Sequence, residues 1–213
     1  MKKTSEPVVY IVHHQNLKGP FFCMAWFPIL IRLWVLDSFF EQNNCYHQYV
    51  DYTFTKRFDM PKLLAICIAF PLSFGVSKLL QSSRSIPVFR GSKDIAKTIR
   101  SSVSALIDGE SLLICPDVDY SDKSFNMGDM HDGFLNLEKY YWKETGYHLA
   151  FIPLCISKCK HRIYVQEAVY FQGKTDFKQE KAKVSQRLKQ ELSNLEKQDR
   201  EEGDQAILQH KVI

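Results

Sequence analysis

Two polar segments directly follow apolar runs that are typical of buried strands. His13 and His14 come after the apolar residues 8–12, and Asp117 comes after the apolar residues 111–115. A histidine placed just beyond a strand end can act as a general base, and a nearby carboxylate can orient it. Successive residues of an extended chain point to opposite sides, so only one of the two histidines is expected to reach a site. We predict that His14 is this base and that Asp117 is its catalytic partner; the alternative is that His14 only satisfies backbone groups of its loop.

Further acidic residues follow the second strand. Asp117, Asp119 and Asp122 form a cluster in which one carboxylate could orient a histidine, bind a substrate hydroxyl or hold a metal ion. A solvated acidic turn is the simpler alternative. A metal site made of His14, Asp117 and Asp119 has no supporting ligand spacing, and we predict neither a metal nor a bound cofactor.

An anion site is predicted after a third strand. Arg90 ends the short run 86–89 and precedes Gly91 and Ser92. An arginine fork binds phosphate, and the helix that begins near Ser92 would add backbone N–H groups to the same anion; a surface arginine is the alternative. Gly133, at the start of a later helix, is predicted to allow close approach of the backbone to a ligand.

Strands and helices alternate along the chain, which predicts an α/β fold: a single-domain mixed sheet flanked by helices. Strands are expected at residues 7–12, 31–36, 86–89, 111–115, 149–156 and 162–166, and helices at 21–28, 45–58, 61–81, 95–107, 133–143 and 177–202. We assign residues 1–176 to an α/β domain. Residues 177–213 form a charged helix, packed on that domain or extending from it, and a tail that is expected to fray from residue 203.

Composition narrows the function without fixing it. The 213 residues are 45% hydrophobic with a formal net charge of +4, so an anionic partner is possible, and no nucleic-acid motif is present. The six cysteines have no metal-ligand spacing and are expected to be reduced core residues of an intracellular protein. The apolar stretch 63–77 is shorter than the ~20 residues that a spanning helix needs, which predicts a core helix or an interfacial segment.

In chain order these segments resemble the glycerophospholipid acyltransferase family, which includes glycerol-3-phosphate and 1-acylglycerol-3-phosphate acyltransferases. The resemblance covers about residues 8–171. His14 matches the histidine of the family's His-x4-Asp motif, Arg90 its phosphate-binding arginine, and the segment 109–117 the approach to its Phe-Pro-Glu-Gly-Thr-Arg-Ser block, with Asp117 at the Glu position and Ser121 at the Ser position. The strand with the central proline at 151–154 matches the fourth block.

Two departures from the family pattern are clear. Gly19 stands where the motif has its aspartate, and Val118, Asp119 and Tyr120 replace Gly-Thr-Arg, so a second phosphate-binding arginine is missing and an acid is placed close to the acceptor phosphate. Asp117 and Asp119 are the candidates to replace the missing acid.

The resemblance implies a peripheral membrane enzyme of phospholipid biosynthesis with the family's fold, located in the cytoplasm or on the inner face of the cell membrane. It would transfer a fatty acyl group from acyl-CoA or acyl-carrier protein to a glycerol-phosphate or lysophospholipid-type hydroxyl. Arg90, Gly91, Ser92, Asp119, Ser121 and Gly133 would bind the substrate. The alternatives are an impaired lipid- or acyl-chain-binding protein on the same fold and a hydrolase that uses the same histidine with water.

Overall fold

The computed structural model describes residues 6–14, 22–23, 27, 30–90, 94–118, 129–157 and 162–210, with side chains up to residue 201. Within this part the chain is mixed α/β, which confirms the predicted fold class at that level. Contacts divide the chain into two compact units. Unit 1 is Met1–Ile31 with Val103–Ile213, and unit 2 is Arg32–Ser102. The prediction of one α/β domain over residues 1–176 differs from this division because the helix-rich residues 32–102 have a core of their own.

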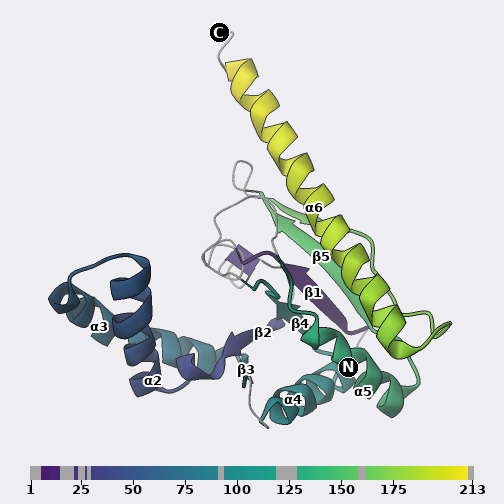
Figure 1. The fold of residues 1–213 in the computed structure, drawn as a ribbon, viewed down its shortest axis with the longest axis horizontal. Coiled ribbons are helices and arrows are strands. Elements are labelled where there is room, and N and C mark those ends of the chain that lie inside the picture. Colours follow the sequence, from purple (N-terminus) through teal and green to yellow (C-terminus); the bar gives the residue numbers. More distant parts are fainter. Residues whose placement is uncertain are drawn as a thin grey trace. The chain divides into compact units, whose positions relative to one another are not determined.

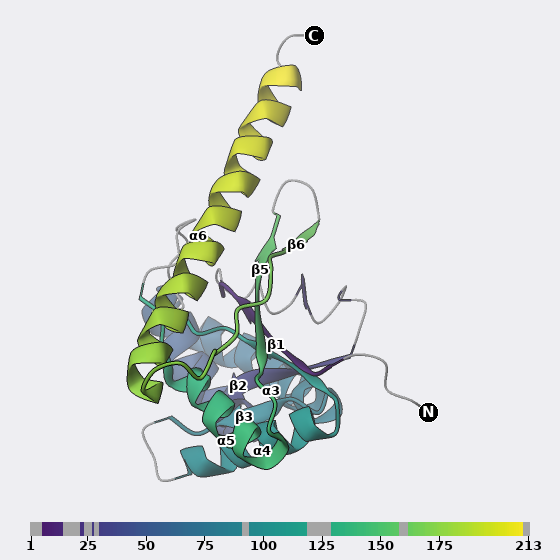
Figure 2. The same cartoon turned by 90° about the vertical axis from the view of Figure 1, so that its right-hand side faces the viewer.

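Unit 1 is built on a mixed sheet with the strand order β4-β1-β5-β6 (β4, β1 and β5 are labelled in Figure 1, and β6 in Figure 2). β1 (Val8–Val12) pairs in parallel with both β4 (Ser111–Ile114) and β5 (Ala150–Ile156), and β6 (Ile163–Val165) runs antiparallel to β5. All four residues of β4 are buried, as expected for a strand of a parallel sheet that is covered on both faces.

Helices complete unit 1. α4 (Ile95–Ile107) crosses the boundary between the units and ends before Gly109, whose φ of 75° allows the turn into β4. The 3-10 turn η3 (Gly133–Leu135) leads into α5 (Asn136–Thr145), which ends at the left-handed Gly146.

The charged C-terminal helix, α6 (Phe177–His210), lies along β5 in both views (Figures 1 and 2). Its apolar residues at helical spacing are buried: Val184, Leu188, Leu192 and Leu195. The helix continues to His210, so the expectation of a frayed tail from residue 203 is wrong up to that point.

Unit 2 contains two parallel strands with four helical segments between them. β2 (Ile31–Leu36) pairs with β3 (Ile86–Val88). Between them lie the 3-10 turn η1 (Asp37–Phe39), α2 (Gln42–His47), the π-helix η2 (Gln48–Arg57) and α3 (Lys62–Ser82). The helix predicted over 45–58 is therefore present, but most of it is a π-helix, with the wider hydrogen bonding of that form. The hydroxyls of Thr53 and Thr55 also donate to backbone carbonyls five residues earlier in the chain.

Phe151 is the centre of the aromatic core of unit 1. Its side chain is fully buried in β5, with ring centroids of Phe134 and Phe171 at 6.0 and 6.1 Å. Phe151→Ala is expected to lower the free energy of unfolding by about 3–5 kcal/mol, because it leaves a cavity where aromatic contacts existed. Urea denaturation followed by circular dichroism measures this loss. Tyr147→Ala, at a side chain that is 73% exposed, is the control, and equal denaturation midpoints for the two variants would contradict this packing.

Candidate functional site

The histidine and the aspartate predicted to share a site do lie at the same edge of the sheet in unit 1. β1 and β4 are parallel neighbours with Ile11 opposite Ile114, so their carboxyl ends lie side by side. The chain after β4 is held by an antiparallel bridge between Asp117 and Met130, which consists of two backbone hydrogen bonds: the Val118 N–H to the Asp129 carbonyl (3.0 Å) and the His131 N–H to the Pro116 carbonyl (2.7 Å). These contacts fix the direction from which the Asp117 side chain reaches the end of β1.

Asp117 binds both histidines, but through different atoms. Its Oδ1 is hydrogen-bonded to Nδ1 of the His13 ring, and its Oδ2 accepts the backbone N–H of His14 at 2.9 Å. An ionised carboxylate only accepts hydrogen bonds, so Nδ1 of His13 is the donor in this contact. Asp117 is 2% exposed and His13 is 4% exposed. The pair is therefore a buried imidazole whose orientation is set through its Nδ1 by the carboxylate.

This geometry differs from the sequence-based choice of histidine. His13 presents its ring to Asp117, whereas His14 donates its backbone N–H to that carboxylate. The catalytic role predicted for His14 stays a prediction. Of the two carboxylates expected to replace the acid missing at Gly19, Asp117 contacts a histidine ring; Asp119 and Gly19 lie outside the described residues.

The predicted substrate-binding residues are only partly described. Arg90 is exposed and follows β3 in unit 2. Gly133 is exposed at the start of η3, and a Cβ added there would meet nothing within 4 Å, so no contact in the structure requires glycine. Gly91, Ser92, Asp119 and Ser121 lie outside the described residues. That these residues form one site with His14 stays a prediction.

Cys115, between β4 and Asp117, is not suited to nucleophilic chemistry at neutral pH. Loss of hydration raises the pKa of its thiol well above the ordinary value, and the negative charge of Asp117 raises it further. Burial also raises the pKa of Cys23 to about 12. Because the thiolate is the reactive form of cysteine, both side chains act as small apolar groups at neutral pH.

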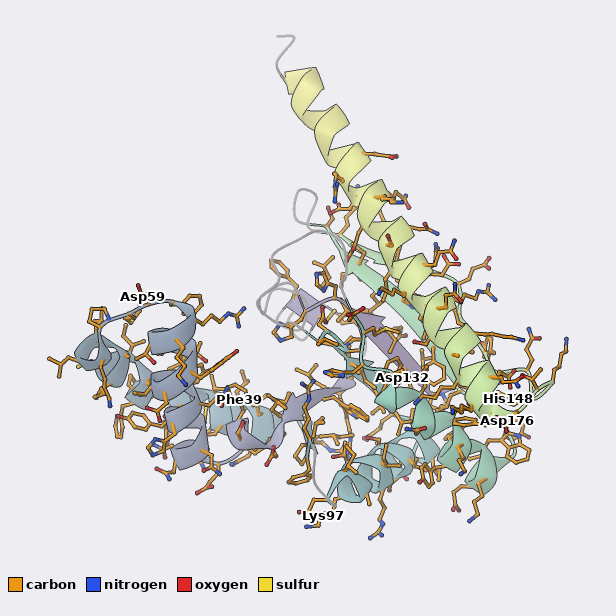
Figure 3. All side chains as sticks on the ribbon, in the orientation of Figure 1. Phe39, Asp59, Lys97, Asp132, His148 and Asp176 are labelled. Carbon is orange, nitrogen blue, oxygen red and sulfur yellow. The ribbon has the colours of Figure 1, made fainter. Side chains whose placement is uncertain are left out.

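A second carboxylate–histidine pair, which the sequence analysis missed, repeats the same arrangement. Oε1 of Glu138 lies 2.5 Å from Nδ1 of His148, and Oε2 accepts the N–H of Leu149 at 2.9 Å. This pair lies before β5, whose first residue, Ala150, pairs with Val8 at the start of β1, so it occupies the opposite edge of the sheet (Figure 3). The His148 side chain is 36% exposed, whereas that of His13 is 4% exposed. No spacing in the sequence connects residues 138 and 148 to this contact.

Metal ligation finds no support in the part of the chain that the structure describes. No group of three or more His, Cys, Asp or Glu side chains lies close enough there to hold an ion. Asp132, just before η3, forms an ion pair with Lys181 of α6 at 3.2 Å.

Comparison with known proteins gives no family assignment: no family model, no curated protein and no solved structure matches this chain significantly.

Proposed function

We propose that this protein transfers an acyl group from a thioester, acyl-CoA or acyl-carrier protein, to the hydroxyl of a glycerol-phosphate or lysophospholipid-type acceptor. The observation that carries the proposal is the buried Asp117, which holds the His13 ring by Nδ1 at the carboxyl edge of two parallel strands. The resemblance of the sequence to the glycerophospholipid acyltransferases supplies the substrate class.

In the proposed reaction, Nε2 of His13 takes the proton of the acceptor hydroxyl as the oxygen attacks the thioester carbonyl. The tetrahedral intermediate then expels the thiolate, which takes the proton back from Nε2, so that an ester and a free thiol result. Asp117 acts as a positioning residue, because it fixes the tautomer and stabilises the imidazolium that forms. A positioned base of this kind contributes about 10²–10⁴ to the rate.

A second candidate is a lipid- or acyl-chain-binding protein without turnover. The observation that favours it is the Glu138–His148 pair, because an identical carboxylate grip occurs at the edge of the sheet away from His13. A carboxylate that is hydrogen-bonded to a histidine ring and to the next backbone N–H can stabilise the end of a strand without activating a base. The low exposure of His13 points the same way.

The deciding experiment is an acyl-transfer assay on the purified full chain. Acyl-CoA and acyl-carrier-protein donors are combined with glycerol phosphate, lysophosphatidic acid and lysophospholipid acceptors, and products are identified by mass spectrometry. An acylated acceptor supports the transferase. Free fatty acid with no acylated acceptor indicates a hydrolase, and saturable binding of lipid with no product over the whole panel indicates the binding protein.

A further inference from the structure

The helix α3 of unit 2 exposes a large apolar surface. No charged residue occurs between Lys62 and Lys78. Among the described residues it is the one helix long and apolar enough to cross a membrane, and only 28% of its most apolar stretch is buried, so it is not a core helix. The exposed side chains include Leu63, Leu64, Ile68, Phe70, Leu72, Phe74 and Leu79, with Leu63 at 81% and Phe70 at 65%. Monomeric soluble proteins rarely leave so continuous an apolar patch uncovered.

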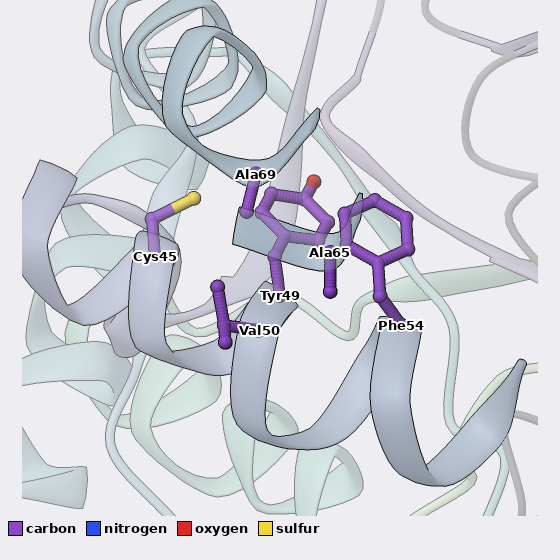
Figure 4. Close-up of a cluster of buried hydrophobic side chains, with 6 residues drawn as sticks. All are labelled: Cys45, Tyr49, Val50, Phe54, Ala65 and Ala69. Atoms are coloured by element: carbon purple, nitrogen blue, oxygen red, sulfur yellow. The ribbon is translucent and has the colours of Figure 1, made fainter. Parts of the chain in front are cut away.

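The opposite side of α3 is already occupied within unit 2. Small residues spaced by four, Ala65, Ala69, Ser73 and Ser77, are buried there. Ala65 and Ala69 pack against Cys45 of α2 and the rings of Tyr49 and Phe54 of η2 (Figure 4). The exposed apolar side chains of α3 are therefore not on the side of the helix that packs against α2 and η2.

The width of the exposed arc argues for a fluid apolar phase rather than a protein partner. On a helical wheel with 100° per residue, all seven exposed apolar side chains lie within one arc of roughly 200°. Phe70 and Leu72 are the two limits of this arc. A helix that packs on a protein surface buries an apolar stripe of about 100°. In α3 the stripe that faces protein is the side that α2 and η2 already cover. A lipid layer surrounds a helix over a wide arc.

The neighbouring segments α2 and η2 indicate that α3 lies in the membrane surface and does not cross it. α2 and η2 expose polar residues: Gln42, Asn43, Asn44, His47 and Asp51. Crossing would carry these groups into hydrocarbon, whereas lying in the interface keeps them in water. The serine hydroxyls of α3 are satisfied within the helix, with Ser77 bonded to the Ser73 carbonyl at 2.8 Å and Ser73 to the Phe70 carbonyl at 2.9 Å.

The turn that joins η2 to α3 carries a basic and aromatic cluster. Lys56, Arg57 and Lys62 flank a single acid, Asp59, and the Arg57 guanidinium lies 5.8 Å from the centre of the Phe58 ring. Phe58 is itself 48% exposed. Basic groups beside exposed apolar side chains are complementary to the headgroups of anionic phospholipids.

We propose that α3 binds the surface of an anionic phospholipid bilayer, with its exposed apolar face among the acyl chains and with Lys56, Arg57 and Lys62 in the headgroup layer. The inference rests on unit 2 alone. It stands or falls independently of the acyl-transfer reaction.

Vesicle sedimentation of the full chain tests the proposal. We expect binding to vesicles of phosphatidylcholine with 30% phosphatidylglycerol and weaker binding, by about tenfold or more, to pure phosphatidylcholine. Phe70→Ser with Phe74→Ser is expected to lower the partition coefficient by about tenfold or more, because two apolar side chains no longer enter the bilayer. Lys56→Glu with Lys62→Glu is expected to abolish the preference for the anionic vesicles.

Matched controls use side chains of similar exposure on α5. Tyr140→Ser with Trp142→Ser removes two exposed aromatic groups, and Lys139→Glu with Lys143→Glu reverses two exposed charges; neither pair should change vesicle binding. Absence of binding to both vesicle types overturns the proposal. So does sedimentation velocity that shows a dimer dissolved by the Phe70 and Phe74 changes, because α3 would then be an interface between two copies.

Discussion

Replacing His13 by alanine is expected to lower the rate of acyl transfer by about 10²–10⁴, because the base that takes the hydroxyl proton is lost. The structure allows a strict comparison with the adjacent histidine. Asp117 is hydrogen-bonded to the ring of His13, whereas from His14 it accepts the backbone N–H. His14→Ala keeps that N–H and should therefore keep the His13–Asp117 pair. The measurement is the initial rate of product formation at saturating donor for the wild type and both variants.

The control for the His13 variant is His148→Ala. This variant removes a histidine from the same kind of carboxylate pair at the other edge of the sheet. It therefore shows how much activity is lost through reduced stability alone, because the proposed base His13 is still present. Activity of His148→Ala should stay within about twofold of the wild type once the folded fraction is taken into account. A His13→Ala variant with full activity would falsify the proposed role, and loss confined to His14→Ala would establish His14 as the base.

Asp117→Asn is expected to lower the rate by up to ~10⁴-fold by reversing the tautomer of His13. The reason lies in the second bond of this carboxylate. The His14 N–H needs an acceptor, so the asparagine side chain places its oxygen there and turns its NH₂ toward Nδ1 of His13. Nδ1 must then accept, the hydrogen moves to Nε2, and the position that should receive the substrate proton is already occupied.

Two readouts separate this positioning role from a merely structural one. Nitrogen NMR of the imidazole should report hydrogen on Nδ1 in the wild type and on Nε2 in Asp117→Asn, and kcat should fall with little change in KM. Glu138→Gln makes the same chemical change in the second pair and should leave activity unaltered. An Asp117→Asn variant with the wild-type tautomer and wild-type kcat would contradict the mechanism.

The elements of this fold are largely predictable from local pattern. The strand at the apolar run 8–12, the helix over 95–107 and the charged helix that begins at residue 177 are each found in the structure as expected. These features depend on residues close together in the chain, where side-chain period and backbone freedom decide the outcome. The π-helical form of η2 and the extension of α6 to His210 were not predicted, because neither changes the apolar period that the sequence displays.

The tertiary structure also decided which side of the apolar stretch 63–77 is buried. The stretch 63–77 was compatible with a core helix or an interfacial one. In the structure its small residues face α2 and η2 and its large apolar residues face outward. Composition alone cannot distinguish these arrangements, because the same residues produce either one depending on which face finds a neighbour.

By itself, the sequence determined the chemistry available to this protein: histidines after one strand, a carboxylate after another, and thiols without a metal-ligand pattern. Only the tertiary structure decided which atoms meet. The parallel pairing of β1 with β4 brings residues 13 and 117 together, and the direction of the chain beyond β1 turns the ring of His13, rather than that of His14, toward the buried carboxylate. The physical reason is that contacts between residues about a hundred positions apart depend on strand order and register, which the local sequence does not specify.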